Sequence, residues 1–209
     1  MSVAEAARVA VHRALPPEET ARADFYALIA RLLHSPPDNA LLANVASAPA
    51  LPADGDARLA TAWQRLVDAS SAMDADAAAE EYELLFGGVG KARVSIYAGF
   101  YAAAASEHPR VRLQTDMAAL GLARPDQVTE PEDHFAALFD VMRILVAGGA
   151  GRSPATLAEQ RRFYAGYVEP SAARFLAAVG SAPEANYYRH VAALAAAFTA
   201  LESESFQLD

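Results

Sequence analysis

The stretch of sequence that decides the fold reads Glu130-Pro131-Glu132-Asp133-His134 and runs directly into an apolar segment. The apolar residues of that segment are Phe135, Leu138, Phe139, Met142, Leu145 and Val146. They recur three and four positions apart, which is the spacing of one face of an α-helix. Proline is tolerated in a first helical turn, and acidic residues there complement the positive end of the helix dipole. The pattern therefore predicts an amphipathic helix over residues 131–147, with a capping box between Thr129 and Glu132.

Helical spacing continues along the rest of the chain, and no run of alternating β-branched residues predicts a strand. Alanine, the residue with the highest helix propensity, is abundant, and the prolines fall between the periodic segments. The sequence therefore predicts an all-α, multi-helix bundle. Its expected helices cover residues 4–14, 18–34, 38–47, 56–72, 75–86, 97–105, 109–120, 131–147, 154–167, 170–179 and 184–204. Its expected core contains Phe25, Leu28, Leu32, Trp63, Leu66, Leu138, Met142, Leu194 and Phe198.

Composition narrows the class of protein. With 209 residues, of which 54% are hydrophobic, the chain can bury a real core in one large domain or two small subdomains. The absence of cysteine excludes disulfides, thiolate catalysis and thiolate metal sites. A net charge of −9 argues against nucleic acid as a partner, because a phosphate backbone is bound by clustered Lys and Arg. An acidic surface suits cationic peptides instead.

The first residues of the chain do not have the pattern of a secretory signal. Residues 1–15 carry Glu5, Arg8, His12 and Arg13 among alanines and lack a continuous apolar region. No run elsewhere approaches the ~20 apolar residues that span a bilayer. We therefore expect a cytoplasmic protein without stable membrane insertion.

A second motif lies upstream of the acidic stretch. It reads Glu81-Tyr82-Glu83-Leu84-Leu85-Phe86-Gly87-Gly88-Val89-Gly90-Lys91 and is followed by Ser95-Ile96-Tyr97 and Tyr101. Together the two motifs resemble the TorD/DmsD/NarJ family of molybdoenzyme maturation chaperones. That family pairs an E-Y-x-x-L-F-x-G-x-G-K segment and a following S-x-Y-x-x-x-Y with a later E-P-x-D-H helix start. The resemblance covers most of the chain, although the prolines usual around the glycine loop are absent and Ser171 replaces a frequent tryptophan.

The resemblance implies both a fold and a function. The expected fold is a TorD-like bundle with two helical subdomains around a shared core, namely residues 1–125 with the glycine loop and residues 126–209 from the acidic helix onward. The expected function is that of a cytoplasmic, system-specific chaperone without catalysis or cofactor. Such a chaperone binds the apo catalytic subunit of a molybdenum or tungsten oxidoreductase, its twin-arginine signal peptide, or both, and assists cofactor insertion and proofreading before export. The acidic helix is most similar to members associated with formate dehydrogenases, and a homodimer formed by helix swapping is left open.

The resemblance also implies site residues. The client or signal peptide is expected to contact Tyr97, Tyr101, Glu130, Asp133 and His134, and a carboxylate among them would hold a signal-peptide arginine. Taken from the residues alone, core packing is the better explanation of the two tyrosines, and helix capping is the better explanation of the acidic residues. Both interpretations stay open at this point. The residues expected to shape the loop between the motifs are Gly87, Gly88, Gly90 and Lys91.

The alternative function is that of a helical nucleotide-binding protein or hydrolase that uses the Gly87–Lys91 loop. A Walker A motif, however, requires glycine where Leu85 stands and Ser or Thr where Ala92 stands. A dinucleotide fingerprint requires a third glycine where Arg93 stands. The five histidines are scattered and form no pair four positions apart, which predicts no metal site. A plain scaffold or oligomerisation module is the third possibility.

Overall fold

The computed structural model describes residues 15–87, 92–101, 109–122, 131–149 and 151–208. Within these residues it is helical and contains no strand, only the isolated antiparallel bridges Tyr97–His134 and Gly149–Arg152. The predicted all-α class is therefore confirmed. The helices are α1 (Pro17–His34), α2 (Asn39–Ala46), α3 (Ala57–Ala72), α4 (Ala75–Phe86), α5 (Pro109–Ala119), α6 (Phe135–Ala147), α7 (Leu157–Phe163), α8 (Glu169–Ser181) and α9 (Tyr188–Leu208).

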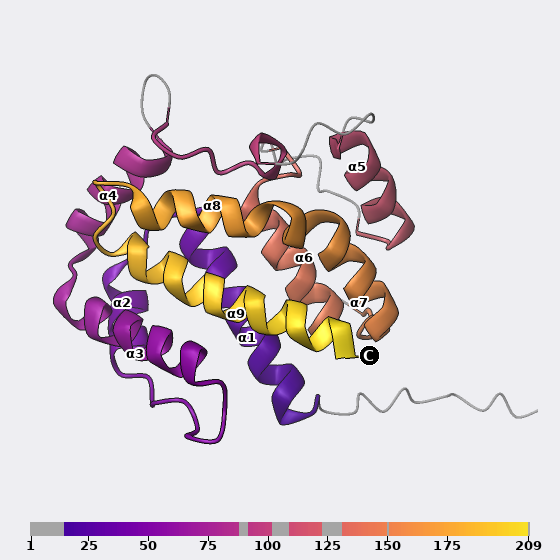
Figure 1. Cartoon of the computed structure of the whole chain (residues 1–209), viewed down its shortest axis with the longest axis horizontal. Helices are drawn as coiled ribbons and strands as arrows, with labels where there is room; N and C mark the ends of the chain where they lie inside the picture. Colours follow the sequence, from indigo (N-terminus) through magenta and orange to yellow (C-terminus); the bar gives the residue numbers. More distant parts are fainter. Residues whose placement is uncertain (1–14, 88–91, 102–108, 123–130, 150, 209) are drawn as a thin grey trace, which may run out of the picture.

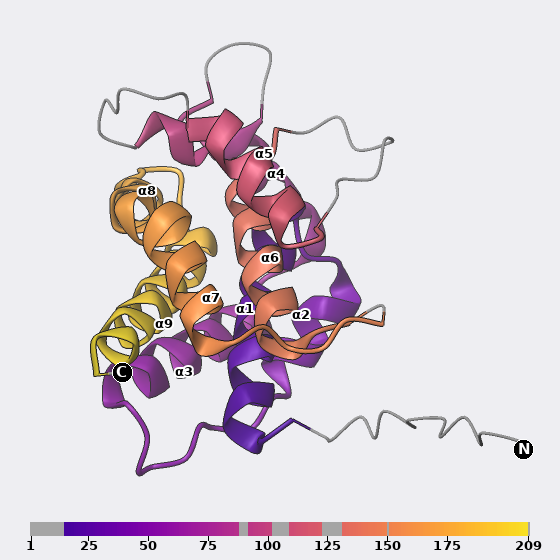
Figure 2. The same ribbon diagram turned by 90° about the vertical axis from the view of Figure 1, so that its right-hand side faces the viewer.

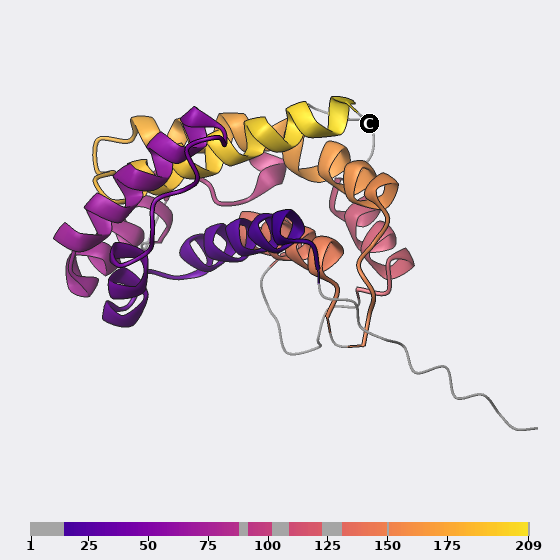
Figure 3. The ribbon, with the colours of Figure 1, turned by 90° about the horizontal axis from the view of Figure 1, so that it is seen from below.

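Two layers of paired helices form the centre of the molecule. One layer consists of α8 and α9, and the other consists of α1 and α6 (Figure 1). Figures 2 and 3 show these layers on opposite sides of the bundle, from the side and from below. Helices α2, α3 and α4 lie at one end, where α3 packs against α9, and α5 and α7 lie at the other. None of the helices described is long and apolar enough to cross a membrane.

Aromatic side chains join the two layers. The rings of Tyr26 on α1 and Phe198 on α9 meet edge-to-face at 4.7 Å, and Phe135 on α6 stacks on Phe175 of α8 at 4.0 Å. Burial confirms the expected core residues Leu32, Leu66, Leu138, Met142, Leu194 and Phe198. The expectation was too strong for Phe25, Leu28 and Trp63, which are only partly buried.

Trp63 is less buried than expected because its indole N–H needs a partner. It donates to the carbonyl of Pro49 at 2.9 Å, which holds the ring at the edge of the core. The same ring packs edge-to-face against Phe25 at 5.8 Å. Both aromatic side chains therefore cover the core from its rim.

Three helix starts lie three or four residues later than the sequence pattern predicts. The helix expected from 154 begins at Leu157, after the N-cap Thr156. The helix expected from residue 131 begins at Phe135, because Pro131–His134 forms a turn in which the His134 N–H donates to the Pro131 carbonyl at 3.2 Å. The proposed capping box is wrong in its Glu132 half, because the N-cap is His134; Thr129 lies outside the described residues. The helix expected from 184 begins at Tyr188.

Two further helices differ from expectation in their extent. Of the helix expected over 97–105, the described residues contain only a 3-10 turn, Ala98–Phe100. The helices expected at 154–167 and 170–179 are continuous, because a π-helical turn, Tyr164–Val168, joins α7 to α8. The helix expected over 4–14 falls outside the described residues. The expected division into two subdomains between residues 125 and 126 stays a prediction. Helix α1 packs on α6 and α3 packs on α9, so the two expected subdomains are in contact.

Candidate functional site: the junction of the two motifs

The structure brings the two sequence motifs together. Residues 94–101 run antiparallel to residues 131–135, and we call these two segments the motif junction. The Ala98 N–H donates to the Asp133 carbonyl at 2.8 Å, and the Phe135 N–H donates to the Ile96 carbonyl at 3.0 Å. The second bond also supplies a partner for one of the N–H groups that a helix start leaves without one. The start of α6 is thereby fixed to the segment after the glycine loop.

Asp133 fastens this pairing with its side chain. It is 3% exposed, and its Oδ2 accepts from the Gly99 N–H at 3.2 Å. A Cβ at position 99 would lie 2.9 Å from that oxygen, which is closer than real Cβ contacts come, so glycine lets the carboxylate reach the turn without a shift. Asp133 therefore orders the Ala98–Phe100 turn from inside the protein.

His134 caps α6 and supports Tyr97. Its side chain is 5% exposed, and its Nδ1 accepts from the Ala136 N–H at 3.1 Å. Its ring lies edge-to-face with that of the half-buried Tyr97, with centroids 5.5 Å apart. An imidazole in this place satisfies a backbone donor at the helix start, as an N-cap oxygen would.

Tyr101 is part of the core and not of the surface. Its hydroxyl donates to the Ser95 carbonyl at 2.9 Å, and its ring contacts Phe135 and Phe175. Burial raises the pKa of this hydroxyl above its ordinary value. Because Tyr101 is buried and hydrogen-bonded, it braces the junction against α8.

The accessible groups of the junction are aromatic and acidic. Phe100 is 73% exposed, next to the buried Tyr101 whose ring lies 5.0 Å away. Glu132 is partly exposed and accepts from the Gln114 side-chain amide of α5 at 2.9 Å. The site thus consists of a fixed backbone with an exposed phenyl ring, a half-buried tyrosine and a carboxylate near the solvent. The candidate residue Glu130 lies outside the described residues.

The glycine loop is only partly described. Gly87 ends α4, where its N–H donates to the Glu83 carbonyl at 3.1 Å. Gly88, Gly90 and Lys91 lie outside the described residues. No group of side chains suitable for a metal ion occurs in the part of the chain that the structure describes.

Sequence reasoning missed the role of Glu81, the first residue of the upstream motif. Its carboxylate is buried and accepts three backbone N–H groups, those of Asn186 at 2.8 Å, Tyr187 at 2.8 Å and Tyr188 at 2.7 Å. These are donors at the start of α9, so Glu81 caps that helix from another element. A signal was present, because Ala78, Glu81 and Leu85 recur at helical spacing and a carboxylate on such a face needs buried partners.

Comparison with known proteins now gives the family. A family model described as nitrate reductase delta subunit matches residues 53–177, which is more than half of the chain. No match was found among curated proteins. The matched segment includes both motifs and the junction between them. The chain therefore belongs to the nitrate reductase delta subunit (NarJ/TorD) family, whose members are non-catalytic cytoplasmic chaperones that bind a molybdoenzyme subunit during its maturation.

Proposed function

We propose that this chaperone serves an exported molybdenum or tungsten oxidoreductase, and that the motif junction receives the client's apo catalytic subunit, its twin-arginine leader, or both. The observation that carries the proposal is Phe100, an aromatic side chain that is 73% exposed on a turn held by Asp133. Aromatic residues on a fixed backbone bind partners efficiently because little side-chain freedom is lost. A leader of this class is basic at its start and apolar after it.

The structure suggests a division of roles among the candidate residues. Phe100 and Tyr97 are accessible enough to contact the apolar part of a leader, whereas Asp133, His134 and Tyr101 position the junction. We assign the arginine contact to Glu132, because its carboxylate lies nearer to the solvent than that of Asp133. An arginine fork on a carboxylate makes a short, charge-assisted pair. The net charge of −9 favours the approach of such a basic segment.

The mechanism that we propose is mass action. A chaperone that binds the unfinished subunit more tightly than the mature one delays export until the cofactor is in place. Among the clients of this class we propose a formate dehydrogenase, which the similarity of the acidic helix supports. The proposed mechanism requires no catalysis by any residue of the junction.

Replacing Phe100 tests the proposal. The probe is a synthetic peptide of the twin-arginine leader of a formate dehydrogenase catalytic subunit, and the measurement is titration calorimetry. We expect Phe100→Ala to weaken binding about tenfold, which corresponds to about 1.4 kcal/mol, with an unchanged melting temperature. Leu208→Ala is the control, because that side chain is 88% exposed at the far end of α9. Equal affinities of wild type and Phe100→Ala would remove the junction from the binding surface.

A further inference from the structure

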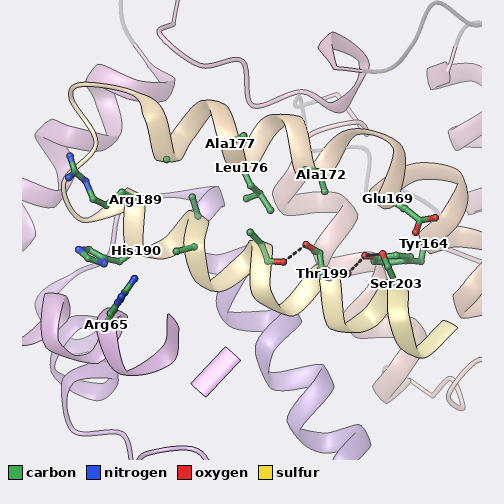
Figure 4. A pocket seen from close by; sticks show the side chains of 16 residues that line it. Arg65, Tyr164, Glu169, Ala172, Leu176, Ala177, Arg189, His190, Thr199 and Ser203 are labelled. Carbon is green, nitrogen blue, oxygen red and sulfur yellow. Dashed lines mark hydrogen bonds between the residues drawn. The ribbon is translucent and has the colours of Figure 1, made fainter. Parts of the chain in front are cut away.

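A second surface lies between α8 and α9, apart from the motif junction (Figure 4). It is an open groove of about 590 Å³ in whose walls alanine is the commonest residue. Ala173 and Ala177 on α8 and Ala193 and Ala196 on α9 are all exposed along it. The lining on α8 extends from Glu169 to Gly180, which corresponds to about 16 Å of helix.

One end of this α8–α9 groove is basic. Arg189 and His190 of α9 lie there beside Arg65 of α3 (Figure 4). Among the described residues, no carboxylate forms an ion pair with Arg65 or Arg189, and the Arg189 Nε donates to the Ala185 carbonyl at 2.6 Å. In a chain with a net charge of −9, this cluster is a local exception. It indicates a partner with negative charge at this point.

The other end of the groove has the opposite character. Glu169 lies there, at the start of α8, with the hydroxyls of Tyr164 and Ser203 (Figure 4). The Tyr164 hydroxyl donates to the Thr199 carbonyl at 2.6 Å and lies 3.0 Å from that of Ser203, so these groups are already hydrogen-bonded. The carboxylate of Glu169 is the charged group that remains exposed at this end. The groove therefore has a negative and a positive end with an apolar floor between them.

We propose that the α8–α9 groove binds an amphipathic α-helix of a partner protein, with its amino end at Glu169 and an acidic carboxyl end at Arg65, Arg189 and His190. Small side chains on both walls allow a third helix to approach at the 8–10 Å between axes that is usual for packed helices. A helix is positive at its amino end and negative at its carboxyl end, which matches the polarity of the groove. Glutamates in its last turn would strengthen this match.

This surface is distinct from the one proposed for the leader. A basic leader would meet the two arginines, Arg65 and Arg189, at one end of the groove, and like charges disfavour that contact. The two surfaces nevertheless share α8, because the Arg174 Nη1 donates to the Tyr101 carbonyl of the junction at 3.1 Å while Ala173 and Ala177 face the groove. One chaperone can therefore hold a basic segment and an acidic helix at the same time.

The test uses a pair of synthetic peptides about 15 residues long, which span about 22 Å as helices. Both carry Ala and Leu on one face; one has three Glu in its last turn and the other has three Lys. Fluorescence anisotropy should show that the Glu peptide binds at least about tenfold more tightly, and that the preference falls with added salt. Equal affinities, or no binding of the Glu peptide, would overturn the proposal.

Two variants with matched controls locate the binding. Arg65→Glu should weaken the Glu peptide about tenfold, whereas Arg161→Glu, the same charge change at an exposed site on α7, should not. Ala196→Phe fills the groove from an exposed position and should abolish binding, whereas Ala118→Phe on α5 should not. All four should melt near the wild-type temperature. Unchanged affinity in both groove variants would place the peptide elsewhere and overturn the proposal.

Two further outcomes would assign the groove to another occupant. If the twin-arginine leader displaces the Glu peptide, the groove belongs to the leader and our proposal is wrong. If sedimentation shows a dimer that Ala196→Phe dissociates, the occupant is a second copy of the chain. Failure of the leader to bind anywhere would count against the proposed function and would leave the result with the Glu peptide standing.

Discussion

The carboxylate of Glu81 lies 2.7 Å from the backbone nitrogen of Tyr188, although 107 positions separate the two residues in the sequence. Together with the bonds to Asn186 and Tyr187, this contact fixes the start of α9 against α4. The first residue of the upstream motif, Glu81, thus stabilises the fold. The end of the motif belongs to the junction that we propose as the binding surface.

Glu81→Gln should destabilise the protein by about 2–4 kcal/mol. The amide keeps the size of the side chain, but it removes the charge and turns an NH₂ group toward backbone donors. Urea unfolding followed by circular dichroism measures the change. Glu80→Gln alters the exposed neighbour on the same helix and should have no effect. A wild-type midpoint for Glu81→Gln would show that these three hydrogen bonds do not support the fold.

Glu202→Gln should destabilise the protein by about 3 kcal/mol, because it breaks a buried pair with Arg22. Glu202 accepts from Arg22 at 2.8 and 2.7 Å and from the Tyr26 hydroxyl at 2.7 Å. Burial by itself would lower the pKa of Arg22, but the bonds to Glu202 and Glu19 outweigh it and raise that pKa. Arg22 therefore stays charged, and in the variant its Nε and Nη2 would lose their charged acceptor while Nη1 keeps Glu19.

The same measurement has an exposed counterpart on the same helix. Glu204 pairs with Arg58 at 2.9 Å at the surface, where salt and water screen the interaction. Glu204→Gln should leave the unfolding midpoint unchanged. Comparable losses in the two variants would contradict the assignment of stability to the buried pair.

Stability should fall as the pH drops below about 6.5, in part because of His190. Burial, with the charges of Arg189 and Arg65, lowers the pKa of His190 from its ordinary value of 6.5, and Glu81 opposes this shift. The unfolded state then binds the proton more readily, so its contribution to stability is complete above pH 6.5 and is lost as the pH falls. His190→Gln should flatten this dependence in urea unfolding at several pH values. An NMR titration that gives His190 a pKa above 6.5 would contradict the sign.

Glu132→Gln and Asp133→Asn should separate binding from positioning. Glu132→Gln should weaken the leader by about 1.5–3 kcal/mol at an unchanged melting temperature if it holds an arginine. Asp133→Asn should lower the melting temperature, because its buried carboxylate orders the Gly99 turn. Titration calorimetry and melting curves on both variants give the comparison. The reverse pattern would return the arginine contact to Asp133.

The sequence predicts those features of the structure that depend on neighbouring residues. It predicts less well the features that depend on residues far apart in the chain. The helices α1, α3 and α4 lie within one residue of their expected bounds, because local spacing, prolines and N-caps such as Asp56 and Asp74 determine them. The start of α6 was misplaced because its backbone pairs with residues 96 and 98. The meeting of the two motifs was expected from the family resemblance. The sequence could not predict that the side chains of Asp133 and His134 hydrogen-bond to backbone N–H groups. Those bonds depend on the conformation of a turn that is distant in the sequence.

The π-helical turn Tyr164–Val168 has a consequence for the rotational phase of the helices on either side of it. Tyr164 bonds toward α9, at the Thr199 carbonyl, whereas Tyr167 bonds toward α5, at Asp116 Oδ2, 2.5 Å away. Deleting Gly166 would return this segment to α-helical geometry and rotate α7 by about 100° relative to α8. Such a change removes neither tyrosine. The rotation would nevertheless prevent Tyr164 and Tyr167 from keeping their hydrogen bonds to α9 and α5 at the same time. The wider turn thus sets the rotation at which one continuous helical rod presents Tyr164 toward α9 and Tyr167 toward α5.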